Sequence, residues 1–269
     1  MKKVALITLH GMGKIKSHYF AELAAGLAQR LGNEWPDVAF RNVQYQPELQ
    51  GPQDALWEAM SECEDNQLDG VKLREFLLYG FGDAGSLEHS LRTKEKKTYL
   101  LTQAQIFQTL SAALNDAQGN INMPVVLIAQ SLGCQVISNY LWDAEHGTNL
   151  FDPEFSAYRQ GEPISDFHRL TSCAQLVTTG CNIPLFVSGL AERVCFKPPT
   201  AAFRWDNYYD RDDVLGWPLR QLGPTYNIVH DHPINAGGAL SSWNLASHGE
   251  YWSDANVLDP LAQTLRDLM

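Results

Sequence analysis

Residues 125–135 read VVLIAQSLGCQ, and this stretch decides the fold. A short continuous apolar run, expected as a strand over residues 124–128, is typical of a strand covered on both faces of a parallel sheet. Residues 132–146 then carry apolar side chains at helical spacing, and Gly147 follows as a helix stop. Ser131 is therefore predicted to stand at a sharp turn between a buried strand and a helix.

The same alternation of strand and helix extends over the rest of the 269 residues. The pattern predicts further strands at residues 4–9, 38–45, 175–179, 203–208 and 226–229. It predicts further helices at residues 20–31 and 99–117, and a last helix that Asp259 caps and Pro260 begins. Strands that alternate with helices predict an α/β fold, with a mostly parallel central sheet and helices on both faces.

Residues 46–97 interrupt this alternation. Short helices are expected at 54–63 and 71–78, followed by a glycine-containing stretch and a charged segment at 92–97. We interpret the insertion as a cap-like excursion beside or over the sheet. Since no repeat or linker is evident, a single domain is expected over residues 1–269.

Composition excludes several classes of function. The net charge of −11 argues against binding to nucleic acid or to anionic lipid. No run of about 18 apolar residues occurs, so no stable membrane insertion is expected. The apolar run at residues 4–9 is too short for a secretory leader, and the five cysteines are scattered. We therefore expect a cytoplasmic protein with reduced thiols and no cofactor or metal, and the oligomeric state stays open.

Ser131 has the surroundings of a nucleophile. Ala129 and Gly133 flank it two residues away on either side, forming the pattern A-x-S-x-G. A serine held in a tight strand-to-helix turn needs small neighbours at these two positions, because larger side chains would collide. The helix that follows also directs its positive end at a developing anion. A helix-capping serine is the alternative interpretation.

A serine hydroxyl needs a base, and His248 is the preferred one. It lies in a loop, SHGEYW, between the last predicted strand and the last predicted helix. His230 and His232 could suggest a metal pair, but no third ligand is evident, so surface histidines are the favoured interpretation.

The base in turn needs a carboxylate that orients its ring. Residues 210–214 read DRDDV and leave a predicted strand. Asp212 is the preferred acid, with Asp213 and then Asp210 as alternatives, whereas Asp206 lies inside the strand.

An anionic intermediate also requires donors for its oxygen. The backbone N–H of Leu132 follows the nucleophile directly and is the first expected donor. The loop His10-Gly11-Met12-Gly13 ends the first strand, and its glycines allow a close backbone approach to a substrate. The N–H of Met12 is therefore the second expected donor. A simple glycine turn is the alternative.

Taken together, HGMG, AQSLG, DRDDV and SHGEYW resemble the α/β-hydrolases, close to their lipase and esterase branch. The resemblance runs from His10 to His248, with the motifs in the order Ser, Asp, His. Two positions depart from the family pattern: Ala129 replaces the usual Gly, and Gln130 occupies a position often held by His. Neither departure removes a catalytic atom.

The resemblance implies hydrolysis of a small-molecule carboxylic ester through an acyl-enzyme on Ser131. Substrate contacts are expected from Gly11, Gln130, Ile183 and Leu185. Three alternatives stay open: a thioesterase, amidase, peptidase or acyltransferase on the same scaffold; a non-catalytic binding protein of this fold; and a metal-dependent enzyme that uses residues 230–232.

Overall fold

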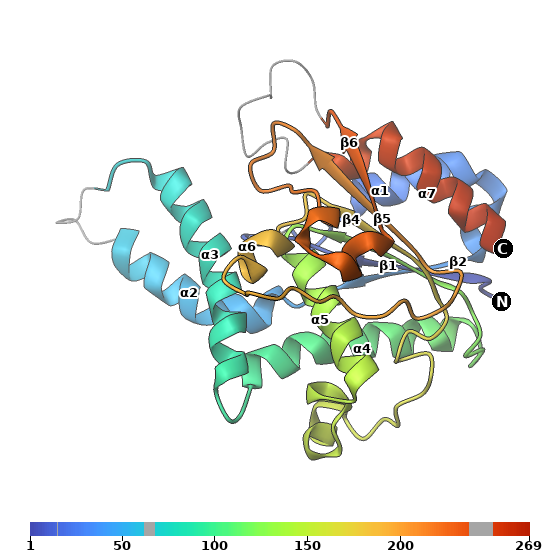
Figure 1. The fold of residues 1–269 in the computed structure, drawn as a ribbon, viewed down its shortest axis with the longest axis horizontal. Coiled ribbons are helices and arrows are strands. Elements are labelled where there is room, and N and C mark those ends of the chain that lie inside the picture. Colours follow the sequence, from blue (N-terminus) through green and yellow to red (C-terminus); the bar gives the residue numbers. More distant parts are fainter. Residues whose placement is uncertain (15, 62–67, 237–249) are drawn as a thin grey trace.

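The computed structural model describes residues 1–14, 16–61, 68–236 and 250–269. Within these residues, six parallel strands form one sheet in the order β2-β1-β3-β4-β5-β6 (Figure 1). The strands are β1 (Val4–Leu9), β2 (Val38–Val43), β3 (Val125–Gln130), β4 (Cys173–Thr179), β5 (Arg204–Asp210) and β6 (Val229–Ile234).

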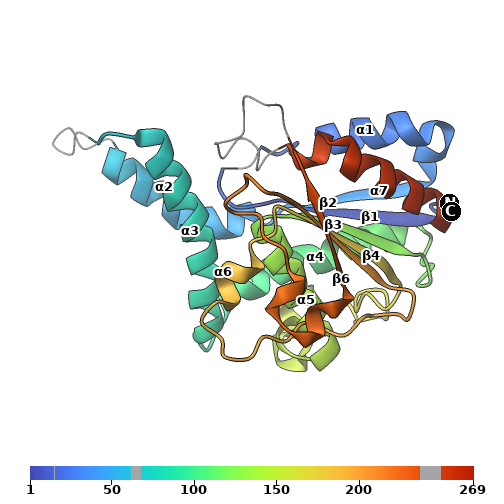
Figure 2. The ribbon, with the colours of Figure 1, turned by 45° about the horizontal axis from the view of Figure 1, so that its top comes forward.

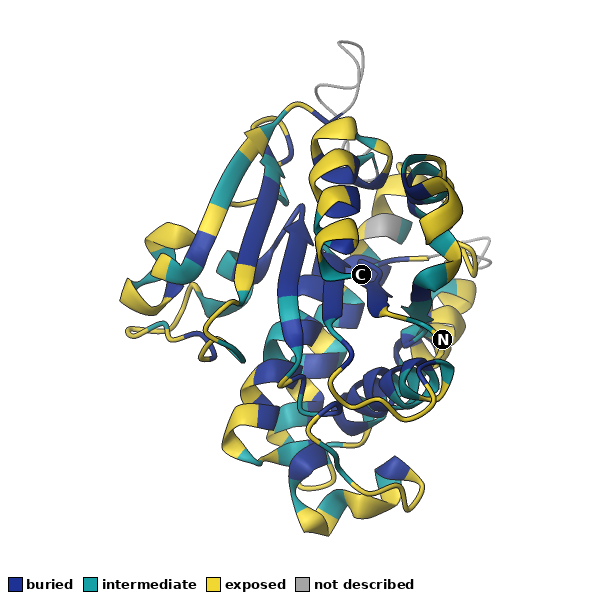
Figure 3. Ribbon diagram, turned by 90° about the vertical axis from the view of Figure 1, so that its right-hand side faces the viewer, coloured by how far each residue is buried: buried dark blue, intermediate teal, exposed yellow. Residues whose placement is uncertain are grey.

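The long helices cover both faces of the sheet. Helices α1 (Ala21–Leu31) and α7 (Ala255–Leu268) pack on one face, and α4 (Lys97–Asp116) and α5 (Leu132–His146) pack on the other (Figure 2). Alternate residues of a strand therefore enter different cores. Leu6 and Val126 face α1 and α7, whereas Ile7 and Leu127 face α4 and α5. Because both faces are covered, β1 is buried along its whole length, which explains its unbroken apolar sequence (Figure 3).

Two further helices, α2 (Gln46–Ser61) and α3 (Val71–Arg92), pack against each other and project beyond the carboxyl ends of the strands (Figures 1 and 2). Tyr79 of α3 is buried, and its hydroxyl donates to Asp54 of α2 at 2.6 Å. Both helices are longer than the sequence predicts: α2 begins at Gln46 and contains Pro52, and α3 continues through the glycines at positions 80, 82 and 85. We call this pair the α2/α3 hairpin.

The α/β fold class with a parallel sheet is confirmed, but two further predicted boundaries are wrong. The last strand, expected at residues 226–229, begins only at Val229 and runs to Ile234, because Pro224–Ile228 form a short 3-10 helix. Helix α7 begins at Ala255 with Asp254 as its cap, and Pro260 lies inside the helix. The Asp254 side chain accepts from the N–H of Asn256, which is the interaction expected of Asp259. The shorter helix α6 (Ile183–Val187) follows β4. In the part of the chain that the structure describes, no helix has the length and apolar character needed to cross a membrane.

Strand register brings the ends of β1, β3 and β4 together. Leu9 pairs with Ala129, and Gln130 pairs with Thr179. The loop that begins at His10 and the turn at Ser131 therefore leave adjacent strands at the same edge. In parallel sheets this carboxyl edge is where ligands bind.

Candidate active site

Ser131 occupies a backbone conformation that non-glycine residues rarely adopt, with φ 52° and ψ −122°. Such a conformation costs on the order of 1–3 kcal/mol and persists only where the surroundings enforce it. Its N–H donates to the carbonyl oxygen of Thr179 at 3.0 Å, which extends the β3–β4 pairing into the turn. Helix α5 begins at the next residue, Leu132. The sharp strand-to-helix turn expected from the sequence is therefore present.

The hydroxyl of Ser131 is buried and, among the described residues, has no hydrogen-bond partner. Its side chain does not cap α5. The alternative interpretation, a helix-capping serine, therefore loses its structural basis. The N–H of Leu132 lies in the first turn of a 15-residue helix, where backbone N–H groups have no acceptor within the helix.

The turn at Ser131 and the loop after β1 are in direct contact. A Cβ added to Gly133 would lie 2.5 Å from the carbonyl oxygen of His10, and one added to Gly11 would lie 2.9 Å from the Cβ of Ser131. Neither position accepts a side chain without displacing backbone or the serine itself. Both glycines are therefore required by the close approach of the two loops.

The loop at residues 10–13 is held on its inner side by His10. Its Nδ1 lies 2.8 Å from the carbonyl oxygen of Gly11, and its ring stacks on Tyr45 with 4.0 Å between ring centroids. Burial lowers the pKa of His10 to about 4, so the ring is neutral near neutral pH. Since a carbonyl can only accept, Nδ1 carries the proton.

The outer side of the loop is held by the α2/α3 hairpin. The N–H of Gly13 donates to Oδ2 of Asp83 at 2.9 Å. Its carbonyl oxygen accepts from the side-chain amides of Gln46 and Gln50, at 2.6 and 2.9 Å. Gln53 donates to the other oxygen of Asp83 at 3.0 Å. Sequence reasoning missed this network, because Asp83 is 70 residues from Gly13 and belongs to no motif.

The three aspartates of the acidic turn have different environments. Asp210 ends β5 and accepts from the N–H groups of Asp212 and Ala236 at 2.9 and 2.7 Å. Asp212 itself is exposed and lines a surface cavity of about 440 Å³. Asp213 is buried, and its carboxylate accepts from Leu215 N–H at 2.9 Å and from the Tyr251 hydroxyl at 2.8 Å.

Residues 251 and 252 are tied to the carboxyl edge of the sheet. The hydroxyl of Tyr251 bridges Asp213 and the N–H of Asp210, which donates to it at 2.9 Å. Trp252 donates through Nε1 to Oγ1 of Thr179 at 3.1 Å, at the end of β4. The predicted base, His248, lies outside the described residues. It precedes Tyr251 by three positions in the sequence.

The predicted donors and substrate-contacting residues lie at this edge, with different exposures. Met12 is half-buried and lies close to α3: a Cβ added to Gly80 would be 2.7 Å from the Met12 sulfur. Gln130 ends β3 and is also half-buried. Ile183 begins α6 and is buried in the core, whereas Leu185 of the same helix is exposed.

Asn182, directly before α6, was not predicted. It is completely buried, and neither atom of its amide has a partner among the described residues. An unpartnered polar group of this kind is unusual in a protein core and often marks a functional position.

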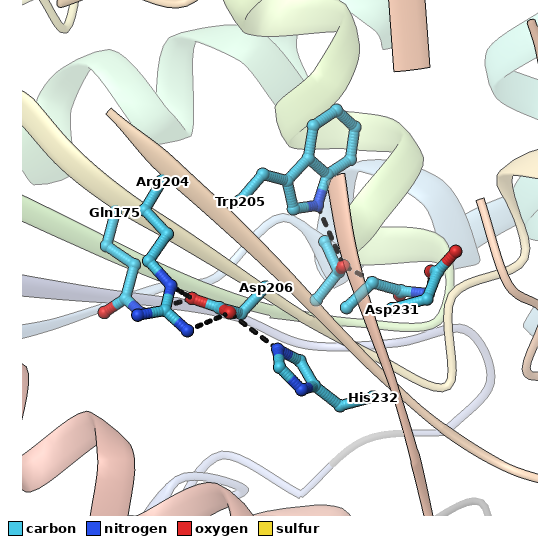
Figure 4. Close-up of polar contacts among 8 residues, drawn as sticks. Gln175, Arg204, Trp205, Asp206, Asp231 and His232 are labelled. Atoms are coloured by element: carbon cyan, nitrogen blue, oxygen red, sulfur yellow. Dashed lines mark hydrogen bonds and ion pairs between the residues drawn. The ribbon is translucent and has the colours of Figure 1, made fainter. Parts of the chain in front are cut away.

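Asp231 and His232 contact different groups of residues (Figure 4). His232 lies 2.7 Å from the buried carboxylate of Asp206, which also accepts from Gln175 and forms an ion pair with Arg204. Asp231 instead accepts from Asn207 and from the N–H groups of residues 219 and 220. Asp206 is four residues before the end of β5, so this cluster lies along the sheet and away from its carboxyl edge.

Within residues 1–14, 16–61, 68–236 and 250–269, no group of three or more His, Cys, Asp or Glu side chains could hold a metal ion. The metal interpretation of residues 230–232 therefore gains no support from these positions.

Replacing Gly133 by Ala tests the contact between the two loops. Because the new Cβ would meet the carbonyl oxygen of His10, we expect the free energy of unfolding to fall by about 1–3 kcal/mol. The matched control is Gly85→Ala in α3, where nothing lies within 4 Å and stability should stay equal or rise. Urea denaturation measures both, and an equally stable Gly133→Ala variant would contradict the contact.

Asp83→Asn tests the electrostatic cost of the buried carboxylate. Burial raises the pKa of Asp83 to about 6 from an ordinary value of 3.8, so its charged form is disfavoured in the folded protein. The cost is absent below the unfolded pKa and develops as the pH rises through the folded pKa. Between pH 4 and pH 7.5, the unfolding free energy of the variant relative to the unmodified protein should rise by about 2 kcal/mol. A difference that stays constant with pH, in urea denaturation at both values, would refute this.

A scan with protein-family models and a search of curated protein sequences found no match for this chain.

Proposed function

We propose that this protein is a serine hydrolase of the α/β-hydrolase type that cleaves a carboxylic ester through an acyl-enzyme on Ser131. The observation that carries the proposal is the strained conformation of Ser131, at φ 52° and ψ −122°, together with a hydroxyl that has no partner within residues 1–14, 16–61, 68–236 and 250–269. Strain persists where structure enforces it, and a reactive serine is a reason for a chain to retain such strain. The six parallel strands and the helices on both faces are compatible with this family.

In the proposed first step, Oγ of Ser131 attacks the ester carbonyl carbon while His248 takes the hydroxyl proton. A C–Oγ bond forms, and the carbonyl oxygen becomes an oxyanion. When the bond to the alcohol oxygen breaks, the imidazolium of His248 gives its proton to the leaving alcohol. Water, deprotonated by the same imidazole, then attacks the acyl carbon. The C–Oγ bond breaks, the imidazolium returns its proton to Oγ, and the acid and free Ser131 are released.

Two backbone N–H groups are proposed to stabilise the oxyanion. The N–H of Leu132 is in the first turn of α5. The positive end of the α5 dipole lies at the same turn and favours the oxyanion. The N–H of Met12 has no acceptor recorded among the described residues. Because a trans peptide directs its N–H and C=O to opposite sides, the hydrogen bond from His10 to Gly11 turns the Met12 N–H away from the His10 ring.

Asp213 fits the role of triad acid better than Asp212, which was preferred from sequence. A triad carboxylate is buried and hydrogen-bonded, and it steadies the imidazolium in a site that excludes water. Asp213 is buried and bonded to Tyr251, three residues after His248, whereas Asp212 is exposed. Asp210 directs its two oxygens at backbone N–H groups that close the turn.

The substrate is proposed to be a small-molecule ester that enters at the carboxyl edge, over Gly11 and Gln130. Leu185 and Leu190 are exposed on and after α6, beside the buried Ile183, and offer an apolar wall for an acyl group. A thioester or an amide requires the same nucleophile and the same oxyanion donors. A substrate panel therefore identifies which bond is cleaved.

A fluorophosphonate probe should label Ser131 and inactivate the protein. We expect Ser131→Ala to abolish labelling and to lower ester hydrolysis by at least about 10⁴-fold, because no nucleophile remains. Ser172→Ala is the matched control, since that hydroxyl also has no partner among the described residues but precedes β4 at the opposite edge of the sheet. Mass spectrometry locates the label, and oxygen esters, thioesters and amides of one acyl group identify the scissile bond. Full esterase activity in Ser131→Ala would disprove the assignment.

The triad acid can be identified by comparing Asp213→Asn with Asp212→Asn. The first should lower kcat by about 10³–10⁴-fold, because an amide cannot hold the imidazole of His248 in the required tautomer. The second should change kcat less than about 3-fold, because Asp212 is exposed. Tyr251→Phe controls for the hydrogen bond lost from Asp213 and should keep most of the activity. If Asp212→Asn is the inactive variant, the sequence-based preference was right.

A further inference from the structure

The two peptide groups that flank the Met12 Cα are both fixed by hydrogen bonds, and the first of them carries the Met12 N–H. On one side, the carbonyl of Gly11 accepts from His10. On the other, the N–H of Gly13 donates to Asp83, and the Gly13 carbonyl accepts from Gln46 and Gln50. Gly11, before Met12, is therefore held by His10 at the end of β1. Gly13, after Met12, is held by side chains of the α2/α3 hairpin.

Asp83 is the centre of the second group of contacts. Its Oδ2 accepts from Gly13, and both of its oxygens accept from glutamine amides of α2, with Gln50 at 3.2 and 3.4 Å and Gln53 at 3.0 Å. The side chain is 1% exposed. No cation is among these partners, so the carboxylate is held by neutral donors alone.

A buried carboxylate with only neutral donors is not explained by stability. Burial raises the pKa of Asp83, which means that the folded protein holds the charged form at a cost. An apolar residue of similar size would fill this space without that cost, but it would leave the Gly13 N–H without this acceptor. What the carboxylate supplies is a fixed acceptor that faces the Gly13 N–H from a rigid helix.

We infer that Asp83 is a positioning residue for the proposed hydrolysis: by holding Gly13, it fixes the adjacent Met12 N–H where the oxyanion forms. The inference rests on the proposed function of Ser131. Asp83 is not expected to touch substrate, and its effect is on the transition state. An N–H donor that is free to move stabilises the oxyanion of the transition state less well, while its contact with the neutral carbonyl of the bound substrate matters less. We therefore expect kcat to change more than KM.

Asp83→Leu removes the acceptor at similar size, and Asp83→Asn retains one acceptor oxygen. With the ester found by the substrate panel, we expect Asp83→Leu to lower kcat about 10–100-fold with KM within about 2-fold. Asp83→Asn should stay within about 3-fold of the unmodified protein, because Gln53 can turn its unpartnered Oε1 toward the new amide. Asp54→Ala, which removes the other carboxylate bridge between α2 and α3, should change neither constant.

Hydrogen exchange of the Gly13 amide gives a second readout that does not depend on activity. The amide should be protected in the unmodified protein and in Asp83→Asn, and should exchange at least about 10-fold faster in Asp83→Leu. If Asp83→Leu does not fold, Asp83→Ala replaces it, and the exchange of the unmodified protein already decides whether Gly13 is held. An unprotected Gly13 amide, an unchanged kcat in the Leu or Ala variant, or an equal loss in Asp83→Asn overturns the inference. Absence of probe labelling at Ser131 in the unmodified protein instead refutes the proposed function.

Discussion

The contact between the ends of β1 and β3 constrains the rest of this site. The carbonyl oxygen of His10 lies only 2.5 Å from the position that a Cβ of residue 133 would take, and Ser131 lies 2.9 Å from the corresponding position at Gly11. Strand pairing brings the two ends together, but pairing alone leaves room for side chains between successive turns. Between the loop after β1 and the turn after β3, there is no room for a side chain at position 11 or 133. Ser131 accordingly takes a positive φ, and its hydroxyl stays without a partner among the described residues.

Several polar groups around this contact are held at a cost to stability. His10 is buried and neutral, and the Asp83 carboxylate is buried with an elevated pKa. Both amide atoms of Asn182 lack a partner in the part of the chain that the structure describes. In a core built for stability such groups would be replaced by apolar side chains. Their concentration at one edge of the sheet, together with a strained serine, follows the pattern of stored strain and unsatisfied polarity that functional sites show.

The fold and the serine turn could be predicted from sequence because both depend on local patterns. An unbroken apolar run marks a strand covered on both faces, and Ala129 and Gly133 meet a steric requirement that short-range spacing reveals. The contribution of the α2/α3 hairpin could not be predicted, since Asp83 reaches Gly13 only through the packing of two helices. The start of α7 was misplaced for a related reason: Asp254 and Asp259 are equally good caps in sequence, and packing decides between them.

The acidic turn shows how far residue identity can fall short of residue role. Asp210, Asp212 and Asp213 lie within four positions, and the sequence ranks them only by distance from the strand. Their environments differ because a turn directs successive side chains differently: Asp210 satisfies two backbone N–H groups, Asp212 faces solvent, and Asp213 turns inward to Tyr251. A carboxylate that must orient a base has to be sheltered from water, and shelter comes from the segment that packs over it. Tyr251 and Trp252 provide such a segment at this turn, so the environment of Asp213 depends on a distant part of the chain as well as on the strand that precedes it.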